Sequence, residues 1–192
     1  MPTYLLYKPF NMLSQFTREA PHHITLADLT FNFPKDVYPV GRLDADSEGL
    51  LLLTNDKRLN AKLLHPKNKQ PKTYWVQVEG APVDADLAPL RKGINIKIKK
   101  KIHRTANAIV HLLADIPNLP ERNPPIRVRK SIPDTWVSIT ITEGKNRQVR
   151  RMFAAIGFPV LRLVRVGLAG FTYGEGIIHK MDVGTVIKVE EL

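Results

Sequence analysis

Apolar and polar residues alternate with a period of two along several stretches of the chain, which is the pattern of half-buried β-strands. The clearest stretch is Lys72–Glu79, and the same alternation predicts strands at 94–98 and 137–141. Shorter apolar runs predict further strands at 4–7, 37–40, 50–53, 106–112, 160–166 and 186–189. We therefore expect a chain that is rich in strands.

Helices are expected at few positions. Residues 147–156 form the clearest one, since an apolar residue recurs on one helical face, Asn146 is placed to cap the start and Gly157 follows the end. Shorter helices are predicted at 57–64, with Asp56 as the N-cap, and at 84–90, with one helical turn at 24–29.

Residues 115–134 are expected to form an extended basic loop, because they hold five prolines among several basic residues. The chain shows no internal repeat and no long linker. We therefore expect one domain over residues 1–192, built as two lobes.

Charge narrows the class of partner. The 192 residues hold 29 Lys and Arg against 18 Asp and Glu, a net charge of +11, which favours a nucleic acid as partner. There is no cysteine, which excludes disulfides, thiolate nucleophiles and zinc ribbons. Neither a signal peptide nor an apolar run of about 20 residues is present, so we expect a cytoplasmic protein with no membrane partner.

The segment 41–56, Gly-Arg-Leu-Asp-Ala-Asp-Ser-Glu-Gly-Leu-Leu-Leu-Leu-Thr-Asn-Asp, places Arg42 and Asp44 in a short loop between two apolar runs. Catalytic groups are commonly carried on such loops, where strands hold them in place. Two ordinary interpretations compete, a calcium loop and a plain hairpin. The calcium template fails because Asn55 stands where a bidentate Glu is required and the flanking runs are too short for helices.

A second polar segment is as distinctive. Residues 143–152 read Glu-Gly-Lys-Asn-Arg-Gln-Val-Arg-Arg-Met, and they place Arg147, Arg150 and Arg151 on one face at the start of the predicted helix. Arginines there oppose the helix dipole at a cost of a few tenths of a kcal/mol each. The row is therefore either a solvated basic face or a functional surface.

Three blocks in this order, Gly-Arg-Leu-Asp (41–44), Lys-Thr-Tyr (72–74) and residues 143–152, resemble the pseudouridine synthases of ribosomal RNA. The resembling branch includes the small-subunit enzyme A and the large-subunit enzymes B, E and F, and the similarity runs from Tyr4 to about Gly167. Residues 122–133, Arg-Asn-Pro-Pro-Ile-Arg-Val-Arg-Lys-Ser-Ile-Pro, look most like the large-subunit type E. The resemblance to this type implies a catalytic domain with no accessory RNA-binding domain ahead of it, although many members of the family carry one.

The resemblance implies an α+β fold, with a curved and mainly antiparallel central sheet, flanking helices and a central cleft. It implies isomerisation of one uridine to pseudouridine in large-subunit rRNA, with Asp44 as nucleophile or base. Arg150 matches the arginine that pairs with this carboxylate, and Tyr74 matches the tyrosine that stacks on the uracil. On strand pattern alone, Tyr74 also fits core packing.

The remaining basic residues of these motifs are expected to bind RNA. Arg42 is placed to fill the gap that a flipped nucleotide leaves, although a salt bridge to Asp46 or Glu48 is the competing interpretation. Asp46 and Glu48 themselves are interpreted as solvated loop charges or structural hydrogen-bond partners. Phosphate contacts are expected from Lys72, Arg127, Arg129, Lys130, Arg147 and Arg151.

The isomerisation involves no net redox change and no external group, so neither a metal nor an organic cofactor is expected. We also expect a monomer. A non-catalytic RNA-binding or ribosome-assembly module on the same scaffold is the alternative function. A metal-dependent nuclease is a third possible function, but this sequence lacks the second acidic cluster that such an enzyme needs.

Overall fold

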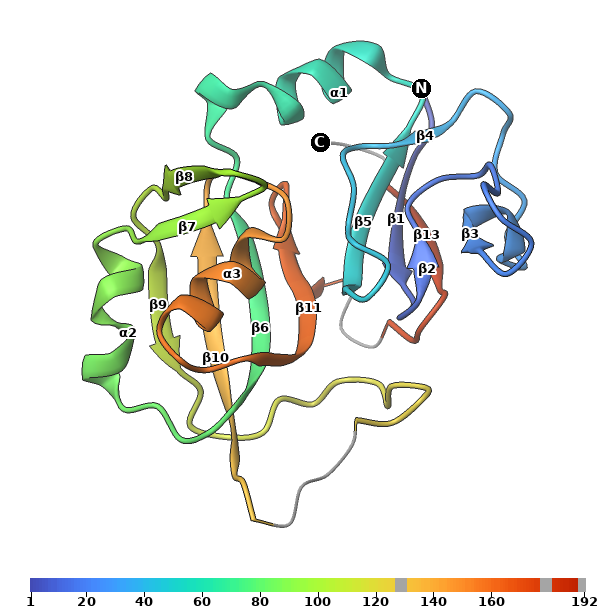
Figure 1. Cartoon of the computed structure of the whole chain (residues 1–192). Coiled ribbons are helices and arrows are strands. Elements are labelled where there is room, and N and C mark those ends of the chain that lie inside the picture. The colour runs from blue at the N-terminus through green and yellow to red at the C-terminus, as the bar shows by residue number, and fades with distance from the viewer. Residues whose placement is uncertain (127–130, 177–180, 190–192) are drawn as a thin grey trace. The chain divides into compact units, whose positions relative to one another are not determined.

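The computed structural model describes residues 1–126, 131–176 and 181–189, and Figure 1 shows the path of the chain. The chain divides into two compact units, one made of Met1–Gln70 with Val164–Leu192 and the other of Pro71–Leu163. The strands of each unit are described in turn.

The strands of the first unit are arranged around β5 (Glu48–Thr54). Its antiparallel neighbours are β1 (Thr3–Lys8) and the short β4 (Tyr38–Pro39), while the end of β11 (Val160–Leu168) runs parallel to it. All residues of β1 and β5 are buried, which explains their nearly continuous apolar sequences. The other edge strands are β13 (Val186–Val189), which pairs with β1, and β12 (Phe171–Thr172), which pairs with β11.

Short elements complete the first unit. The helix α1 (Lys57–Leu64) begins as expected at Asp56, whose carboxylate accepts hydrogen bonds from the backbone N–H groups of Arg58 and Leu59. The predicted turn at 24–29 is a 3₁₀ turn, η1 (Leu26–Asp28). The other short elements are β2 (Met12–Leu13), β3 (Ile24–Thr25) and η2 (Pro66–Asn68).

In the second unit, β10 (Asp134–Ile141) lies between β6 (Lys72–Glu79) and β9 (Ile109–Leu112), and all three strands are antiparallel. Alternate residues of β6 are buried, as the sequence pattern predicts. A separate hairpin joins β7 (Asn95–Ile98) to β8 (Lys101–Arg104), and β8 was not predicted.

Two helices accompany this sheet. In Figure 1, α2 (Asp84–Arg91) packs beside β9, and α3 (Gln148–Ala155) lies next to β7. The expected start of α3 is wrong: its N-cap is Arg147, in the left-handed conformation with φ of 49°, and not Asn146. The Asn146 side chain instead accepts a hydrogen bond from Arg151 at 3.3 Å.

The described structure is thus an α+β fold with mixed, mostly antiparallel strands and three α-helices, as expected. Within residues 113–126 and 131–133 there is neither strand nor helix, in keeping with the predicted extended loop. Across the described ranges, no helix is both long and apolar enough to cross a membrane.

Candidate active site

The Asp44 loop connects two antiparallel strands, so the hairpin interpretation of this segment is confirmed. The loop is closed by hydrogen bonds from the N–H of Val40 to the carbonyl of Leu52 (2.7 Å) and from the N–H of Ser47 to the carbonyl of Asp44 (3.0 Å). Its flanks are strands rather than the paired helices of a calcium loop. Throughout the described residues, no group of three or more His, Asp or Glu side chains is placed to hold a metal ion.

A buried serine holds the residue before Asp44. The Ser14 hydroxyl lies 3.0 Å from both backbone groups of Leu43: it accepts a hydrogen bond from the N–H and donates one to the carbonyl. Ser14 is only 2% exposed, so water does not compete for these bonds. The peptide groups on the N-terminal side of Asp44 are therefore fixed.

A buried lysine holds the residue after Asp44. The ammonium group of Lys8 donates to the carbonyls of Pro9 (2.7 Å), Met12 (2.7 Å) and Ala45 (3.3 Å), and the side chain is fully buried. Asp44 itself is half-buried. Two buried side chains thus hold the backbone on either side of a carboxylate that is open in part to solvent.

Charges around Lys8 oppose one another. Burial lowers the pKa of the Lys8 ammonium from its ordinary 10.5 to about 7; the carboxylates of Glu48, Asp46 and Asp44 act to raise it, and Arg165 acts to lower it. Glu48 is only 1% exposed, so its interpretation as a solvated loop charge is wrong. It begins the buried strand β5, where it offsets the positive charge of Lys8.

The start of β5 also requires a glycine. Gly49 has a φ of +97° and is paired with Arg165 of β11. A Cβ at Gly49 would lie 2.3 Å from the Arg165 carbonyl oxygen, which no other residue can accept without a backbone shift. The side chain of Arg165 is buried as well, and its Nε donates to the carbonyl of Leu50 at 2.7 Å.

Arg42 is exposed on this loop. Its guanidinium donates to the Oε1 atom of Gln15 at 3.0 Å, which joins the Asp44 loop to the segment around Gln15. The contact of Arg42 with RNA stays a prediction.

In the second unit, Glu143 organises the loop before α3. Its carboxylate accepts hydrogen bonds from the N–H of Ala106 (2.8 Å) and from the side chain of Gln148 (2.6 Å), and it pairs with His103 (3.2 Å). The Oε1 atom of Gln148, a buried residue, accepts from the N–H of Lys145 at 2.9 Å. The motif 143–152 thus fixes its own loop, and residues 144–147 remain exposed.

The three arginines of this motif have different surroundings. Arg147 is exposed, and half-buried Arg150 donates from Nη1 to the carbonyl of Val160 at 3.4 Å. Arg151 donates to the Asn146 carbonyl at 3.1 Å and to the Lys97 carbonyl at 2.7 Å, which ties α3 to β7. Arg151 therefore has a structural role, and its contact with phosphate stays a prediction.

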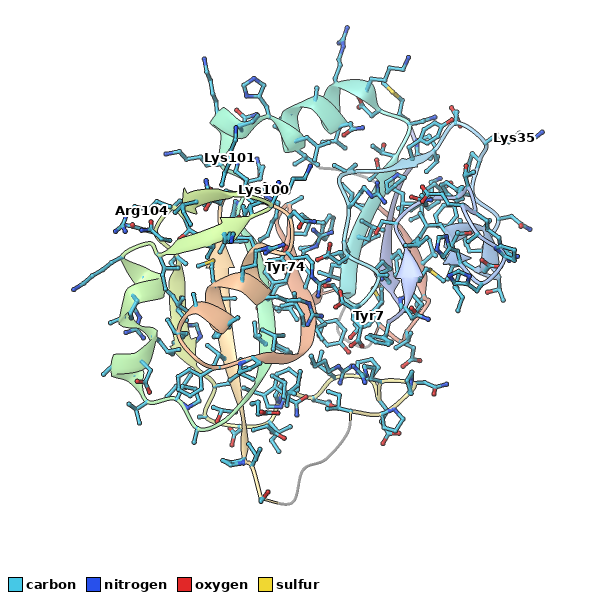
Figure 2. All side chains as sticks on the ribbon, viewed as in Figure 1. Tyr7, Lys35, Tyr74, Lys100, Lys101 and Arg104 are labelled. Carbon is cyan, nitrogen blue, oxygen red and sulfur yellow. The ribbon has the colours of Figure 1, made fainter. Side chains whose placement is uncertain are left out.

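Tyr74 lies on β6 opposite Ile139 and is 7% exposed, with Lys72 half-buried two residues earlier. Figure 2 marks the position of Tyr74 among the side chains. Its burial is compatible with core packing and with a ring that stacks in a closed site.

Comparison with known proteins decides the family. The sequence matches the family described as RNA pseudouridylate synthase over residues 2–155. The chain belongs to this family.

Several pseudouridine synthases are closely similar to the chain. It is 58% identical to ribosomal large subunit pseudouridine synthase E of Vibrio vulnificus over 165 residues, which cover 86% of this chain and 67% of the relative. The corresponding protein of Xanthomonas axonopodis pv. citri is 54% identical over 165 residues (85% and 84% covered). Ribosomal large subunit pseudouridine synthase B of Bacillus subtilis is 40% identical over 162 residues (84% and 59% covered).

Solved structures agree on the fold. A crystal structure of a pseudouridylate synthase superposes with a TM-score of 0.77 at 25% identity, covering 98% of this chain and 70% of that one. Human RNA pseudouridylate synthase domain containing 1 gives a TM-score of 0.62 at 14% identity, covering 98% and 78%, and it supports the fold alone.

The predicted site residues of this pseudouridine synthase are divided between the two units. Asp44 and Arg42 belong to the first; Tyr74, Lys72, Arg147, Arg150 and Arg151 belong to the second. The pairing of Asp44 with Arg150 therefore stays a prediction. The predicted RNA contacts Arg127, Arg129 and Lys130 lie outside the described residues.

Sequence reasoning missed four residues that position these loops, namely Lys8, Ser14, Glu143 and Gln148. One signal was present: Lys8 follows an apolar run directly and precedes a proline, so a lysine ends a strand that is otherwise suited to burial. Ser14 carried no such signal.

Proposed function

We propose that the chain isomerises one uridine of large-subunit ribosomal RNA to pseudouridine. The observation that carries the proposal is the family match over residues 2–155, which contains the Asp44 loop and the motif 143–152. The relatives named above as large-subunit enzymes, up to 58% identical, support the choice of RNA.

In the proposed reaction the bond between N1 of uracil and the anomeric carbon of ribose breaks, the base turns, and carbon 5 bonds to the same anomeric carbon. The proton on carbon 5 then leaves, and N1 gains one. Asp44 acts as nucleophile at the anomeric carbon or as base at the adjacent one. The hydrogen bonds of Ser14 and Lys8 to its neighbours support this role, since they hold the carboxylate without using it.

Arg150 is proposed as the cation that keeps Asp44 ionised once the bound RNA excludes water from the site. Tyr74 is proposed to stack on the uracil and to accept the carbon 5 proton. A single carboxylate in such a site suits isomerisation better than hydrolysis, which would release the base into water. Atoms and electrons balance within the substrate, so the chain's own residues suffice and no cofactor is required.

We further propose that both units act together as one catalytic domain, as a monomer and in the cytoplasm, where ribosomal RNA is modified. Sedimentation of the purified chain tests the monomer, since a second copy would double the mass.

Asp44→Asn tests the proposal, with Asp46→Asn as the matched control two residues away. On a folded fragment of large-subunit rRNA, in EDTA and without nucleotide, wild type should form pseudouridine at one uridine. Asp44→Asn should lose more than about 10⁴-fold in turnover, over roughly 5 kcal/mol of barrier, with RNA affinity nearly unchanged. Asp46→Asn should keep most activity.

Activity of Asp44→Asn above roughly one hundredth of wild type would remove Asp44 from the central role. Wild type that binds the fragment and forms no pseudouridine would favour a non-catalytic RNA-binding module. Activity that depends on a divalent metal with pre-folded RNA would point to a metal enzyme.

A further inference from the structure

The β7–β8 hairpin is strongly basic. Five of the ten residues from Asn95 to Arg104 are Lys or Arg, and residues 87–114 contain neither Asp nor Glu. Figure 2 shows Lys100 and Lys101 at one end of the hairpin and Arg104 at the other. Such a density of one charge on one hairpin is unfavourable for stability, because like charges repel.

These charges surround a hollow. A pocket of about 650 Å³ is lined by Ile98, Lys99, Lys100, Lys101, His103 and Lys145. Its size lies in the range of about 300–1,000 Å³ that is common for ligand sites. It combines the hairpin with the 143–147 loop of the family motif, and all its residues belong to the second unit.

The strand register separates the two faces of the hairpin. Ile98 pairs with Lys101 and Ile96 with His103, so these side chains share the face of the pocket. Lys97 and Ile102 pair on the opposite face. The pocket therefore lies on one face of the hairpin.

The lysines of the pocket are available to a ligand. All four, Lys99, Lys100, Lys101 and Lys145, are exposed, and within the described parts of the chain no hydrogen bond or salt bridge holds their ammonium groups. The nearby carboxylate of Glu143 is already occupied by His103, Gln148 and the N–H of Ala106. The local charge thus remains strongly positive.

The walls of the pocket are held in place before any ligand binds. Arg151 donates to the Lys97 carbonyl on β7, and the pair of His103 with Glu143 joins β8 to the motif loop. At the far end of the hairpin, Thr105 binds the backbone N–H of Ile94 through its hydroxyl at 3.0 Å. A prearranged site loses less entropy when it binds.

We infer that this pocket binds consecutive phosphates of the RNA strand that carries the target uridine. The inference rests on the proposed function for the identity of the strand. Lysine ammonium groups bind phosphate as point charges and read no base, so the pocket contributes affinity and register rather than sequence choice.

The test compares two variants of equal charge. The pocket variant carries Lys100→Gln, Lys101→Gln and Lys145→Gln. The control carries the same change at Lys35, Lys57 and Lys67, which are exposed lysines of the first unit. Binding of the rRNA fragment is measured from about 50 to 300 mM salt, after thermal unfolding has shown that both variants are folded.

The slope of log K against log salt should become less negative by about 2 in the pocket variant, at roughly 0.7 per phosphate contact with unpaired RNA. Affinity should fall roughly tenfold to 100-fold at 0.1 M salt. In turnover, KM should rise while kcat at saturating RNA stays near wild type, because a phosphate contact holds the strand and takes no part in the proposed chemistry. The control should retain its slope within about half a unit.

Equal slopes in the two variants would overturn the inference, because the effect would then be one of net charge alone. An unchanged slope in the pocket variant would overturn the inference as well. So would an unchanged slope in the single variant Lys101→Glu, which reverses one charge on the pocket face. If wild type forms no pseudouridine while the difference in slope persists, the proposed function fails and the phosphate site stands.

Discussion

The buried ammonium of Lys8 should make the stability of the protein depend on pH in a way that one substitution removes. Lys8→Met keeps the length of the side chain and removes the group that titrates. The folded-state pKa is about 7, against an ordinary value of 10.5 that we assign to the unfolded chain. Between these values the unfolded chain holds a proton on Lys8 that the folded chain has released.

The sign follows from proton counting. Stability rises with pH wherever the unfolded state binds more protons, so the contribution of Lys8 rises by about 1.4 kcal/mol per pH unit from about pH 7 to 10. Over the whole window the change amounts to about 5 kcal/mol, and below pH 7 it is constant because both states are protonated. Lys8 is fully buried, so screening by solvent does not reduce this value.

Urea unfolding at pH 6, 7, 8 and 9 for wild type and Lys8→Met measures the effect. The free energy of unfolding of wild type minus that of the variant should be level up to about pH 7 and then climb. The other titrating groups are common to both proteins and cancel in the difference. A difference that stays level to pH 9 would refute the reasoning, and would mean that the three carbonyls and the neighbouring carboxylates keep Lys8 charged.

Three further substitutions test the positions of single residues. Ser14→Ala removes both hydrogen bonds to the loop and should cost about 1–3 kcal/mol of unfolding free energy, with Ser14→Thr as the control that keeps the hydroxyl. Gly49→Ala should lower the free energy of unfolding by more than about 3 kcal/mol in a urea titration, because its Cβ would collide with the backbone of Arg165. Arg150→Ala should lower kcat far more than it raises KM in steady-state assays if it is the counter-charge of Asp44, and an equal change in both would place the counter-charge elsewhere.

Elements that depend on local patterns could be predicted from the sequence. The alternation of Lys72–Glu79 became β6 with the same bounds, and Asp56 caps α1 as expected. Strand β8 was missed because Lys-Ile-His-Arg shows no burial pattern: Ile102 is 68% exposed, and only pairing with β7 defines the strand.

The surroundings of Asp44 could not be predicted for a related reason. The Asp44 loop was found from its own residues, but Lys8 and Ser14 reach it across 37 and 29 positions of sequence. Such contacts join segments that are distant in the sequence, and no local pattern records them. Likewise, the arginines within residues 147–151 could be found in the sequence. The hydrogen bond from Arg151 to the Lys97 carbonyl of β7 could not, because it depends on where the β7–β8 hairpin packs.

The pairing of β1 has a consequence for the order in which a nascent chain can fold. β1 is translated before both of its partners, and one of them, β13, is translated only with residues 186–189. The second unit, by contrast, is one uninterrupted stretch from Pro71 to Leu163, so its strands can pair while the first unit still lacks part of its sheet. We therefore expect the later-coded unit to fold before the earlier-coded one, the reverse of the usual progression from the N-terminus on the ribosome.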